Sequence, residues 1–367
     1  SSTRQVFFND CPVPVANMLS DRGNGFKIAV NILNIGRVKL GAGVLGGART
    51  VTSQCIRYSG ERKQFGVSIN TFGAIKAKLA EMATRIYATE SLCYRAGQDI
   101  EDRMGALAAQ GLSDSEAKLK AMEQFAIECA IAKVHGSEVL DYIVDQGVQI
   151  YGGMGYSADA PMERAYRDAR ISRIYEGTNE INRMLMVGMV LKRAMKGEIN
   201  LFEPAMAVAS ELVSVPSFES IDTSELFAME KDLVHKLKKV FLMVGGKAAM
   251  ALQDRIEDEQ EIMMNLADVM IEIYAAESVL LRTEKLVSLR GEAACAAQIA
   301  MSKIYLYEAI DKVEAAAKEA IVSFAKGDEQ KVMLMGLKRF TKPDFVNTKE
   351  LRRQVADVMI AEGKYPF

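Results

Sequence analysis

The stretch Leu79-Ala-Glu-Met-Ala-Thr-Arg-Ile-Tyr-Ala-Thr-Glu-Ser91 recurs in altered form as Leu266-Ala-Asp-Val-Met-Ile-Glu-Ile-Tyr-Ala-Ala-Glu-Ser278. Flanking matches keep the same order, with Gly46-Gly47 corresponding to Gly245-Gly246, and Lys133 and Glu138 to Lys303 and Glu308. The second copy lacks the segments around 59–70 and 104–120. Self-similarity of this kind indicates a duplicated structural unit. The sequence therefore predicts two related bundles; the alternative is that amphipathic helices resemble one another by composition.

Both copies have the apolar spacing of amphipathic helices. Ile75, Leu79, Met82 and Ile86 follow three- and four-residue steps, which place them on one helix face. Residues 26–58 and 120–150 show the same pattern, and the chain contains only 7 prolines. Long helices joined by short loops form antiparallel bundles. We therefore predict a mainly α fold.

The helical pattern weakens at two places, which set the predicted domain boundaries. Residues 1–14 have the composition of an extended segment that ends at two prolines. A stretch containing Gly, Pro and Ser predicts a linker near 195–222. Because a strand at the first residue needs partners, we expect the chain to be cut from a larger protein. The expected domains are the tail of a β-domain at 1–25, the first bundle at 26–195 and its degenerate repeat at 200–367.

Composition excludes several classes of protein. The net charge is -2 with basic residues spread among acidic ones, so no nucleic-acid partner is expected. The 5 cysteines form no CxxC pair and there are only 2 histidines, so we expect reduced thiols and no metal site. A membrane-spanning helix needs about 18 consecutive apolar residues, and no stretch of the sequence reaches that length. We therefore predict no transmembrane segment.

Three segments of the first copy depart from simple helix patterning. Glu61-Arg-Lys-Gln-Phe-Gly66 combines cations with an aromatic ring, which can hold a phosphate and stack on a base. Gln149-Ile-Tyr-Gly-Gly-Met-Gly-Tyr156 has glycines at a helix end, where backbone amides can approach a diphosphate. Tyr175-Glu-Gly-Thr-Asn-Glu-Ile181 places Glu176 before Thr178, a residue suited to cap the next helix. Each segment alone is more often a solvated turn or helix end.

Taken in order and at this spacing, the segments resemble the acyl-CoA dehydrogenase family. The resemblance covers residues 1 to about 195 and includes Phe8-Asn-Asp-Cys-Pro-Val-Pro14, Gly25-Phe26, Arg37, Arg62-Lys-Gln-Phe-Gly66, Gln149-Ile-Tyr-Gly-Gly153 and Tyr175-Glu-Gly-Thr178. A bundle followed by another helical domain is most similar to the very-long-chain branch, whose members carry such an extension. None of the three segments recurs in 200–367, so the second copy is expected to serve structure or partner contact.

The resemblance implies a base, a substrate site and a flavin site. The base would be Glu176, which removes the pro-R α-proton of a fatty acyl-CoA while the β-hydrogen leaves as hydride to FAD, giving a trans-2-enoyl-CoA in fatty acid β-oxidation. Gly36 stands where one sub-branch keeps its base, which leaves Glu176 as the only candidate. The implied substrate contacts are Arg37, Asn34, Tyr175 and Gly177.

The implied FAD contacts fall into two groups. Thr178 and Glu180 match positions that contact the chain's own FAD, although many members have Gln at the position of Glu180. A second group grips the ADP half of the FAD bound mainly by a neighbouring subunit, and consists of Arg62, Gln64, Phe65, Gln149, Gly152 and Gly153. The resemblance thus implies a homo-oligomer, either a dimer or a dimer of dimers.

The family's partners and the competing functions complete the prediction. The resemblance implies an acyl-CoA substrate, for which the helical extension indicates a long chain, and an electron-transfer flavoprotein as acceptor. A pI near 6.0 favours a bacterial cytoplasm, with the mitochondrial matrix as the alternative. Two other functions remain open: a helical assembly or interaction piece without activity of its own, and an acyl-CoA oxidase-like relative. The chain by itself is expected to be inactive, because other domains complete the family's pocket.

Overall fold

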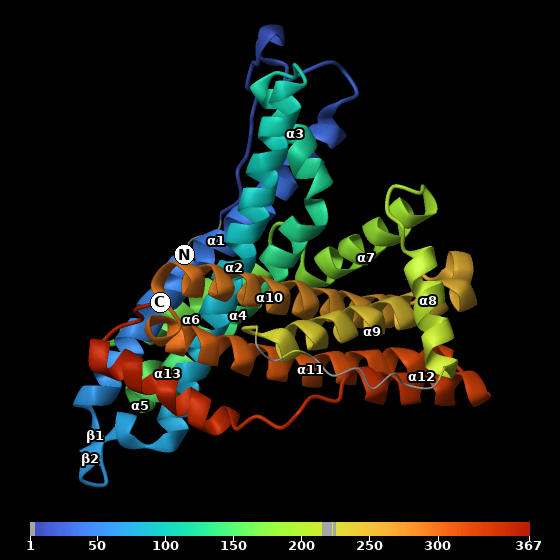
Figure 1. The fold of residues 1–367 in the computed structure, drawn as a ribbon. Coiled ribbons are helices and arrows are strands. Elements are labelled where there is room, and N and C mark those ends of the chain that lie inside the picture. The colour runs from blue at the N-terminus through green and yellow to red at the C-terminus, as the bar shows by residue number, and fades with distance from the viewer. Residues whose placement is uncertain (1–3, 215–221, 223–224) are drawn as a thin grey trace.

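The computed structural model describes residues 4–214, 222 and 225–367, and most of this part of the chain is helical (Figure 1). The first set of helices is α1 (Gly25–Glu61), α2 (Gly73–Ala109), α3 (Asp114–Gln124), α4 (Ala126–Tyr151), α5 (Gly153–Tyr156), α6 (Pro161–Arg170) and α7 (Asn179–Met195). The second set is α8 (Phe202–Val213), α9 (Ala228–Leu252), α10 (Gln260–Arg290), α11 (Ala296–Phe324), α12 (Gly327–Phe340) and α13 (Thr348–Glu362). The strands β1 (Lys63–Gln64) and β2 (Val67–Ser68) form an antiparallel hairpin. The predicted mainly α fold is confirmed.

Helices α1 and α4 form the closest helix pair of the first bundle. A Cβ placed on Gly41 of α1 would lie 2.6 Å from the Ala132 carbonyl oxygen, and a Cβ on Gly136 of α4 would lie 3.0 Å from the Gly41 Cα. Further along, Tyr58 stacks on Tyr151 with ring centroids 3.9 Å apart, so the two helices run in the same direction. Only glycine permits backbones to approach this closely. α2 runs between them in the opposite sense and gives an up-down-up bundle.

The second bundle repeats this arrangement with α9, α10 and α11. The repeated stretches 79–91 and 266–278 lie on α2 and α10, the second long helix of each copy. The flanking matches lie on α1 and α9 upstream and on α4 and α11 downstream. α9, α10 and α11 contact one another and lie side by side in Figure 1. The helices that carry the repeat therefore correspond in chain order.

A chain of buried polar groups joins the two bundles. His135 on α4 lies 3.0 Å from the Thr89 hydroxyl on α2 through Nδ1, and 2.9 Å from the Tyr305 hydroxyl on α11 through Nε2. Tyr305 in turn donates to Glu272 on α10 at 2.9 Å. The apolar core is also continuous across both bundles. A buried polar group without a partner costs about 1–3 kcal/mol. These hydrogen bonds therefore fix how α2, α4, α10 and α11 are aligned.

Two segments differ from the sequence prediction, whereas the extended segment before α1 does not contradict it. Residues 4–14 are exposed and form no strand pairing within the described ranges, so the expected β-domain tail stands here without a partner strand. The predicted loop at 104–120 is largely helical, because α2 continues to Ala109 and α3 begins after a capping box between Ser113 and Glu116. α8 lies inside the predicted linker, since Pro204 falls in the first helical turn, where its missing N–H is tolerated. Pro216 lies outside the described residues.

α1 is long and apolar enough, by length and composition, to cross a membrane, which the sequence analysis did not anticipate. One such helix is a weak indication, because core helices of other proteins meet the same criteria. In this structure α1 packs on α4 and α2, and it contains the buried polar residues Asn31, Asn34 and Arg37.

Candidate active site

Glu176 lies on a sharp turn between the 3₁₀ helix η3 (Ile171–Arg173) and α7. Its φ of 59° is in the left-handed region, and Gly177 follows with a φ of 78°. A non-glycine residue in this region is strained and persists only where its surroundings hold it. The turn ends at Thr178, whose hydroxyl accepts a 3.2 Å hydrogen bond from the Ile181 N–H. The predicted cap of the following helix is confirmed.

Two buried side chains hold the carbonyl groups of this turn. The Asn182 amide nitrogen donates to the carbonyl oxygens of Gly177 and Thr178 at 2.9 Å each and to that of Glu176 at 3.3 Å. Arg37 Nε donates to the Glu176 carbonyl at 3.3 Å from the facing helix α1. The turn is thus held from its own helix and from α1, which fixes the backbone of Glu176.

The Glu176 carboxylate lies directly over Gly36 of α1. A Cβ placed on Gly36 would be 2.6 Å from the Glu176 Cδ and 2.7 Å from Oε1, so the carboxylate occupies space that any other residue would fill. Glu176 and Tyr175 line a shallow depression of about 470 Å³, whose floor is formed by α1 residues including Gly36, Leu40 and Gly43. The small side chains of this floor leave the carboxylate accessible to a molecule lying on α1.

The other predicted substrate residues divide into exposed and buried ones. Tyr175 is 49% exposed beside Glu176, whereas Arg37 and Asn34 are only 3% and 4% exposed. Arg37 donates to the Asn34 side-chain oxygen at 2.9 Å, and burial lowers the pKa of Arg37, with Cys129 and Glu176 opposing that effect. In this structure Arg37 and Asn34 therefore support the turn from below. A direct contact of either residue with acyl-CoA stays a prediction.

Polar residues of α4 and α7 hold the turn from its other side. Lys133 is fully buried and donates to the Asn179 side-chain oxygen at 2.6 Å, and Asn179 is the first residue of α7. Burial lowers the pKa of Lys133 to about 8, while Glu180 and Glu138 oppose the shift. The pKa of Glu180 is lowered, first by a hydrogen bond from its own backbone N–H and then by Thr178. Glu180 itself is exposed at the start of α7.

Sequence reasoning missed Asn182, Asn179 and Lys133. A signal for the two asparagines exists, because positions 179 and 182 fall on the same helix face as the buried Met186 and Val190. Polar residues on an apolar stripe indicate a buried hydrogen-bond network. Lys133 gives no such signal, since a lysine in a helix is usually solvated.

The predicted Arg62–Phe65 segment forms the β1–β2 hairpin. Phe65 and Gly66 are its two turn residues and have φ angles of 53° and 84°, as two-residue hairpins require. Phe65 is 94% exposed at the tip, and Arg62 and Gln64 are also exposed. An exposed aromatic ring on a strained turn, next to cations, suits contact with a ligand or another chain.

The second predicted segment lies at the end of α4 close to this hairpin. Gln149 is exposed, and Gly152 has a φ of 62° and a ψ of −141°, a conformation largely confined to glycine. A Cβ on Gly152 or Gly153 would meet nothing within 4 Å, so their backbone is open. Tyr58, near the end of α1, donates to the Tyr151 carbonyl at 3.2 Å and ties the two segments together. The structure thus brings these two predicted flavin segments to one end of the bundle.

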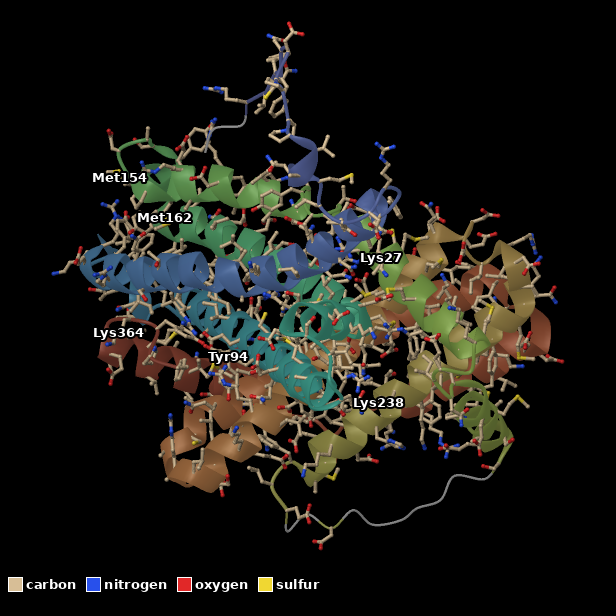
Figure 2. The ribbon with its side chains drawn as sticks, turned by 90° about the horizontal axis from the view of Figure 1, so that it is seen from above. Lys27, Tyr94, Met154, Met162, Lys238 and Lys364 are labelled. Carbon is tan, nitrogen blue, oxygen red and sulfur yellow. The ribbon has the colours of Figure 1, made fainter. Side chains whose placement is uncertain are left out.

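Glu176 lies far from that end. Gly36 and Arg62 are 26 residues apart along α1 (62 − 36), which at about 1.5 Å per residue corresponds to about 39 Å. In Figure 2, Lys27 near the start of α1 and Met154 on α5 lie at opposite ends of the first bundle. The predicted site residues therefore form two clusters, one around Glu176 and one around the hairpin.

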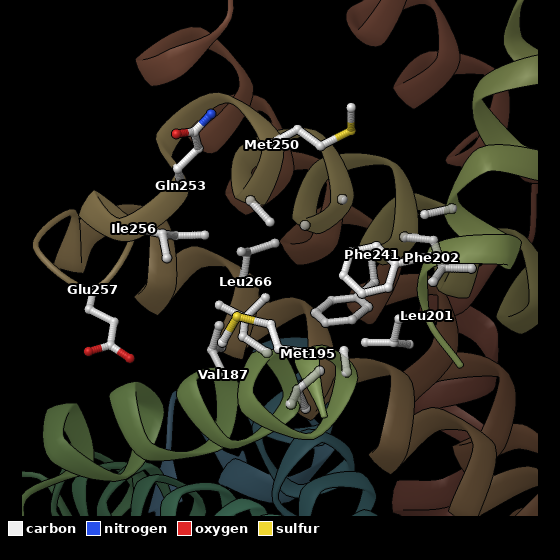
Figure 3. Close-up of a pocket in the computed structure, with 18 of the residues that line it drawn as sticks. Val187, Met195, Leu201, Phe202, Phe241, Met250, Gln253, Ile256, Glu257 and Leu266 are labelled. Carbon is white, nitrogen blue, oxygen red and sulfur yellow. The ribbon is translucent and has the colours of Figure 1, made fainter. Parts of the chain in front are cut away.

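An apolar cavity in the second bundle contains none of the predicted residues. It has a volume of about 440 Å³ and lies between α7, α8, α9 and the start of α10. Phe202, Phe241 and Leu266 point into it, whereas Glu257 lies at its edge (Figure 3). Its lining includes the carboxylates of Asp254 and Glu257 but none of the residues that the sequence predicts for a site. We therefore place the candidate active site at the Glu176 turn.

These features define the class of the protein: a duplicated helical domain that presents a single carboxylate on a strained turn over a glycine-containing helix face. Comparisons with known proteins give the family. The family model described as Acyl-CoA dehydrogenase, C-terminal domain matches residues 23–191, and a second model with that description matches residues 236–339. The chain belongs to the acyl-CoA dehydrogenase family.

Individual relatives support this assignment. The chain is 40% identical over 365 residues to a probable acyl-CoA dehydrogenase of Bacillus subtilis (strain 168), covering 100% of this chain and 61% of that protein. It is 33% identical over 306 residues to the mitochondrial very long-chain specific acyl-CoA dehydrogenase of Rattus norvegicus, which covers 78% of this chain and 44% of that protein. The crystal structure of an acyl-CoA dehydrogenase complexed with FAD from Bacillus anthracis matches with a TM-score of 0.92 at 40% identity. The match covers 97% of this chain and 60% of that one.

A more distant structure shares only the fold. Acyl-CoA oxidase3 from Yarrowia lipolytica matches with a TM-score of 0.64 at 17% identity, over 90% of this chain and 49% of that one. The two Bacillus proteins and the rat protein are all longer than this chain, which spans about 44% to 61% of their lengths.

Proposed function

We propose that this chain provides the base and part of the flavin site for FAD-dependent α,β-dehydrogenation of a fatty acyl-CoA to a trans-2-enoyl-CoA. One observation carries the proposal: the Glu176 carboxylate lies over Gly36 on a turn held by Arg37 and Asn182. A fixed carboxylate on an open, largely apolar floor can meet the α-carbon of a thioester that lies along α1. Membership of the family supports the same reaction.

Within this reaction Glu176 takes the α-proton on its carboxylate. The turn orients the carboxylate, because the Glu176 carbonyl is held from both sides and the side chain has Gly36 beneath it. Proton transfer requires an acceptor in a fixed position within hydrogen-bond reach of its target. The N–H of Glu176 is proposed to donate to the thioester oxygen, which stabilises the enolate-like charge. The floor of α1 excludes water on one side of the acyl chain.

The proposed cofactor is FAD, which when bound supplies the acceptor for the hydride that leaves the β-carbon. The residues present suit its ADP half: Arg62 provides a cation, Phe65 an exposed ring, and Gly152 and Gly153 an open backbone. The relative from Bacillus anthracis is described as complexed with FAD. Because the hairpin lies about 39 Å from Gly36 along α1, we propose that the hairpin serves a neighbouring subunit's flavin in a homo-oligomer. Thr178 and Glu180, beside Glu176, are proposed to contact the chain's own flavin.

The remaining sequence predictions are kept as proposals. The domain division at 195–200 has support in the two family matches, of which one ends at residue 191 and the other begins at residue 236. A long acyl chain has support in the likeness to the very long-chain specific enzyme of Rattus norvegicus, and a bacterial cytoplasmic location in the Bacillus subtilis relative. An electron-transfer flavoprotein is the proposed acceptor. An oxidase-like reaction with oxygen is the alternative, and the fold likeness to acyl-CoA oxidase3 is compatible with it.

The proposal is tested on protein expressed from the complete coding sequence. Palmitoyl-CoA should bleach the flavin absorbance of the wild type, and Glu176→Gln should keep its flavin but react at least about 10²–10⁴-fold more slowly, because the general base is lost. Glu163→Gln, on the surface of α6, is a control that should react like the wild type. A Glu176→Gln variant that keeps more than about a tenth of the wild-type rate contradicts the role of Glu176. If the flavin absorbance of the wild type does not bleach, the alternative is favoured in which the chain is a helical assembly or interaction piece. Rapid reoxidation by oxygen favours the oxidase-like one.

A further inference from the structure

Arg183 of α7 connects the Glu176 turn to both bundles. Its Nη1 and Nη2 donate to the two carboxylate oxygens of Glu138 on α4 at 2.7 and 3.1 Å. Its Nε donates to Asp268 on α10 at 2.8 Å. The Arg183 side chain is only 12% exposed, so the guanidinium is enclosed between its two carboxylate partners. A planar guanidinium bound at three nitrogens has its orientation fixed as well as its position.

The residues around Arg183 pass this constraint to the turn. Asn182, its neighbour in the chain, donates to the carbonyls of residues 176–178. Asn179, one helical turn before Arg183, donates to Glu138 Oε1 at 3.0 Å. Glu138 thus binds both Asn179 and Arg183, and the first turn of α7 is attached to α4 at two points. Asp268 adds a polar attachment of α7 to the second bundle, beside the packing of α7 on α10.

The two copies of the repeat use the matching residues differently. Lys133 and Glu138 of the first copy both bind the start of α7. Their counterparts bind elsewhere: Lys303 pairs with Glu230 at 3.3 Å, and Glu308 accepts from Arg352 of α13 at 2.5 Å. The polar cluster at the start of α7 therefore belongs only to the copy that has the Glu176 turn. Asp268 is the second bundle's contribution to it.

The Arg183–Asp268 ion pair is suited to orient the turn more than to stabilise the fold. The Asp268 and Glu138 side chains are 42% and 39% exposed, so solvent partly screens their charges, although burial of the rest of the side chain raises the pKa of Asp268, with Arg183 opposing that shift. Partly exposed ion pairs of this kind contribute little to the free energy of unfolding. Loss of Asp268 would nevertheless leave Arg183 Nε without this partner and remove one of the restraints on α7. The expected consequence is a small change in stability and a larger change in the position of Glu176.

We propose that Asp268 is a positioning residue for the dehydrogenation: the second bundle holds Arg183, and through it the first turn of α7, so that the Glu176 carboxylate stays over Gly36. The inference rests on the proposed function and extends it to a residue outside the bundle that contains the base. It gives the second copy a role in the chemistry without any substrate contact of its own.

The test compares Asp268→Ala with Glu277→Ala in protein from the complete coding sequence, because alanine removes the oxygen that accepts the hydrogen bond whereas an amide would keep one. Glu277 lies on the same helix and pairs with Arg95 of α2 at 2.9 Å and with Lys238 of α9, both outside α7, so it is a control for loss of an ion pair between bundles. Asp268→Ala should lower kcat for flavin reduction by about 10-fold with little change in KM, a smaller loss than the roughly 10²-fold that a ~1 Å misplacement can cause. The kinetic isotope effect with α-deuterated palmitoyl-CoA should increase, because proton removal becomes slower. Glu277→Ala should change neither quantity.

Amide hydrogen exchange gives a readout that does not need activity. Residues 176–182 should exchange several-fold faster in Asp268→Ala than in the wild type or in Glu277→Ala, because the restraint on α7 is lost. Unchanged exchange there overturns the proposal even if the protein is not a dehydrogenase. Faster exchange with unchanged kcat and isotope effect also overturns it, since Asp268 would then hold the turn without positioning the base. A wild type that shows no flavin bleaching would refute the proposed function separately.

Discussion

Gly36→Ala should damage the chemistry of the Glu176 site while sparing the fold. The added Cβ would lie 2.6 Å from the Glu176 Cδ and nearer still to Oε2, whereas ordinary contacts begin at 3.4 Å, so the carboxylate must move by about 1 Å. The atoms in conflict are the end of a flexible side chain, which can move at small cost. A misplacement of ~1 Å at a reacting group can lower the rate about 10²-fold. We therefore expect flavin reduction by palmitoyl-CoA to slow by about that factor in stopped-flow measurements.

The stability of the same variant should hardly change. Alanine is favoured over glycine inside a helix by about 0.8–1.0 kcal/mol, which offsets the cost of displacing the carboxylate. Gly97→Ala is the matched control, because Gly97 also lies inside a long helix and its added Cβ would meet nothing within 4 Å. It should gain stability and keep the wild-type rate. If Gly36→Ala folds, binds flavin and retains more than about half of the wild-type rate, the carboxylate over Gly36 is not the reacting base.

Three further results are expected. Arg62→Ala should lose flavin on dialysis and regain it with excess FAD, because one charge-assisted hydrogen bond to a diphosphate contributes about 1.5–3 kcal/mol. If the variant instead keeps stoichiometric flavin after dialysis, Arg62 does not contact the diphosphate. Refolded mixtures of Arg62→Ala and Glu176→Gln should regain activity, because a mixed dimer contains one site with neither change; no recovery would contradict sharing of the site between subunits. The pKa of His135 is lowered to about 4, mainly by burial, with Glu272 opposing. Since the unfolded chain then binds more protons below pH 6.5, the free energy of unfolding should fall by about 3 kcal/mol between pH 6.5 and 4 through this group. Urea unfolding should show a weaker pH dependence in His135→Gln; an unchanged dependence would contradict the burial argument.

The sequence could predict the helices because their apolar spacing is local information. The stripe through Leu79 and Met82 is buried as expected, and both residues are fully enclosed. The repeat also predicted which helices correspond, since matched residues fall on α2 and α10. The weaker stretches were less predictable. Pro204 contributes to the prediction of a linker where α8 lies, because proline usually interrupts a helix, although a proline in the first turn costs little.

The site was predictable only where its signal lies in adjacent residues. Glu176, Gly177 and Thr178 are contiguous, and the cap formed by Thr178 follows from its place before α7. The neighbours that fix the turn come from other helices: Arg37 lies 139 positions away from Glu176 (176 − 37) and contacts it only because α1 packs on the bundle. No periodicity in the sequence encodes such a contact. The collision of a Gly36 Cβ with the carboxylate likewise depends on the distance between two segments.

The strain at Glu176 gives a reason for the second bundle to remain attached to α7. A glutamate with a positive φ would relax to an ordinary conformation if only its own loop held it. Arg37, Asn182 and Asn179 supply restraints from the first copy, and Asp268 adds one from the second through Arg183. A second copy that had lost its own loops could thus be retained for the rigidity it gives to the first. On this view its usefulness depends on contacts such as Asp268 with α7, and substitutions on faces of the second bundle that do not reach α7 should leave the dehydrogenation rate unchanged.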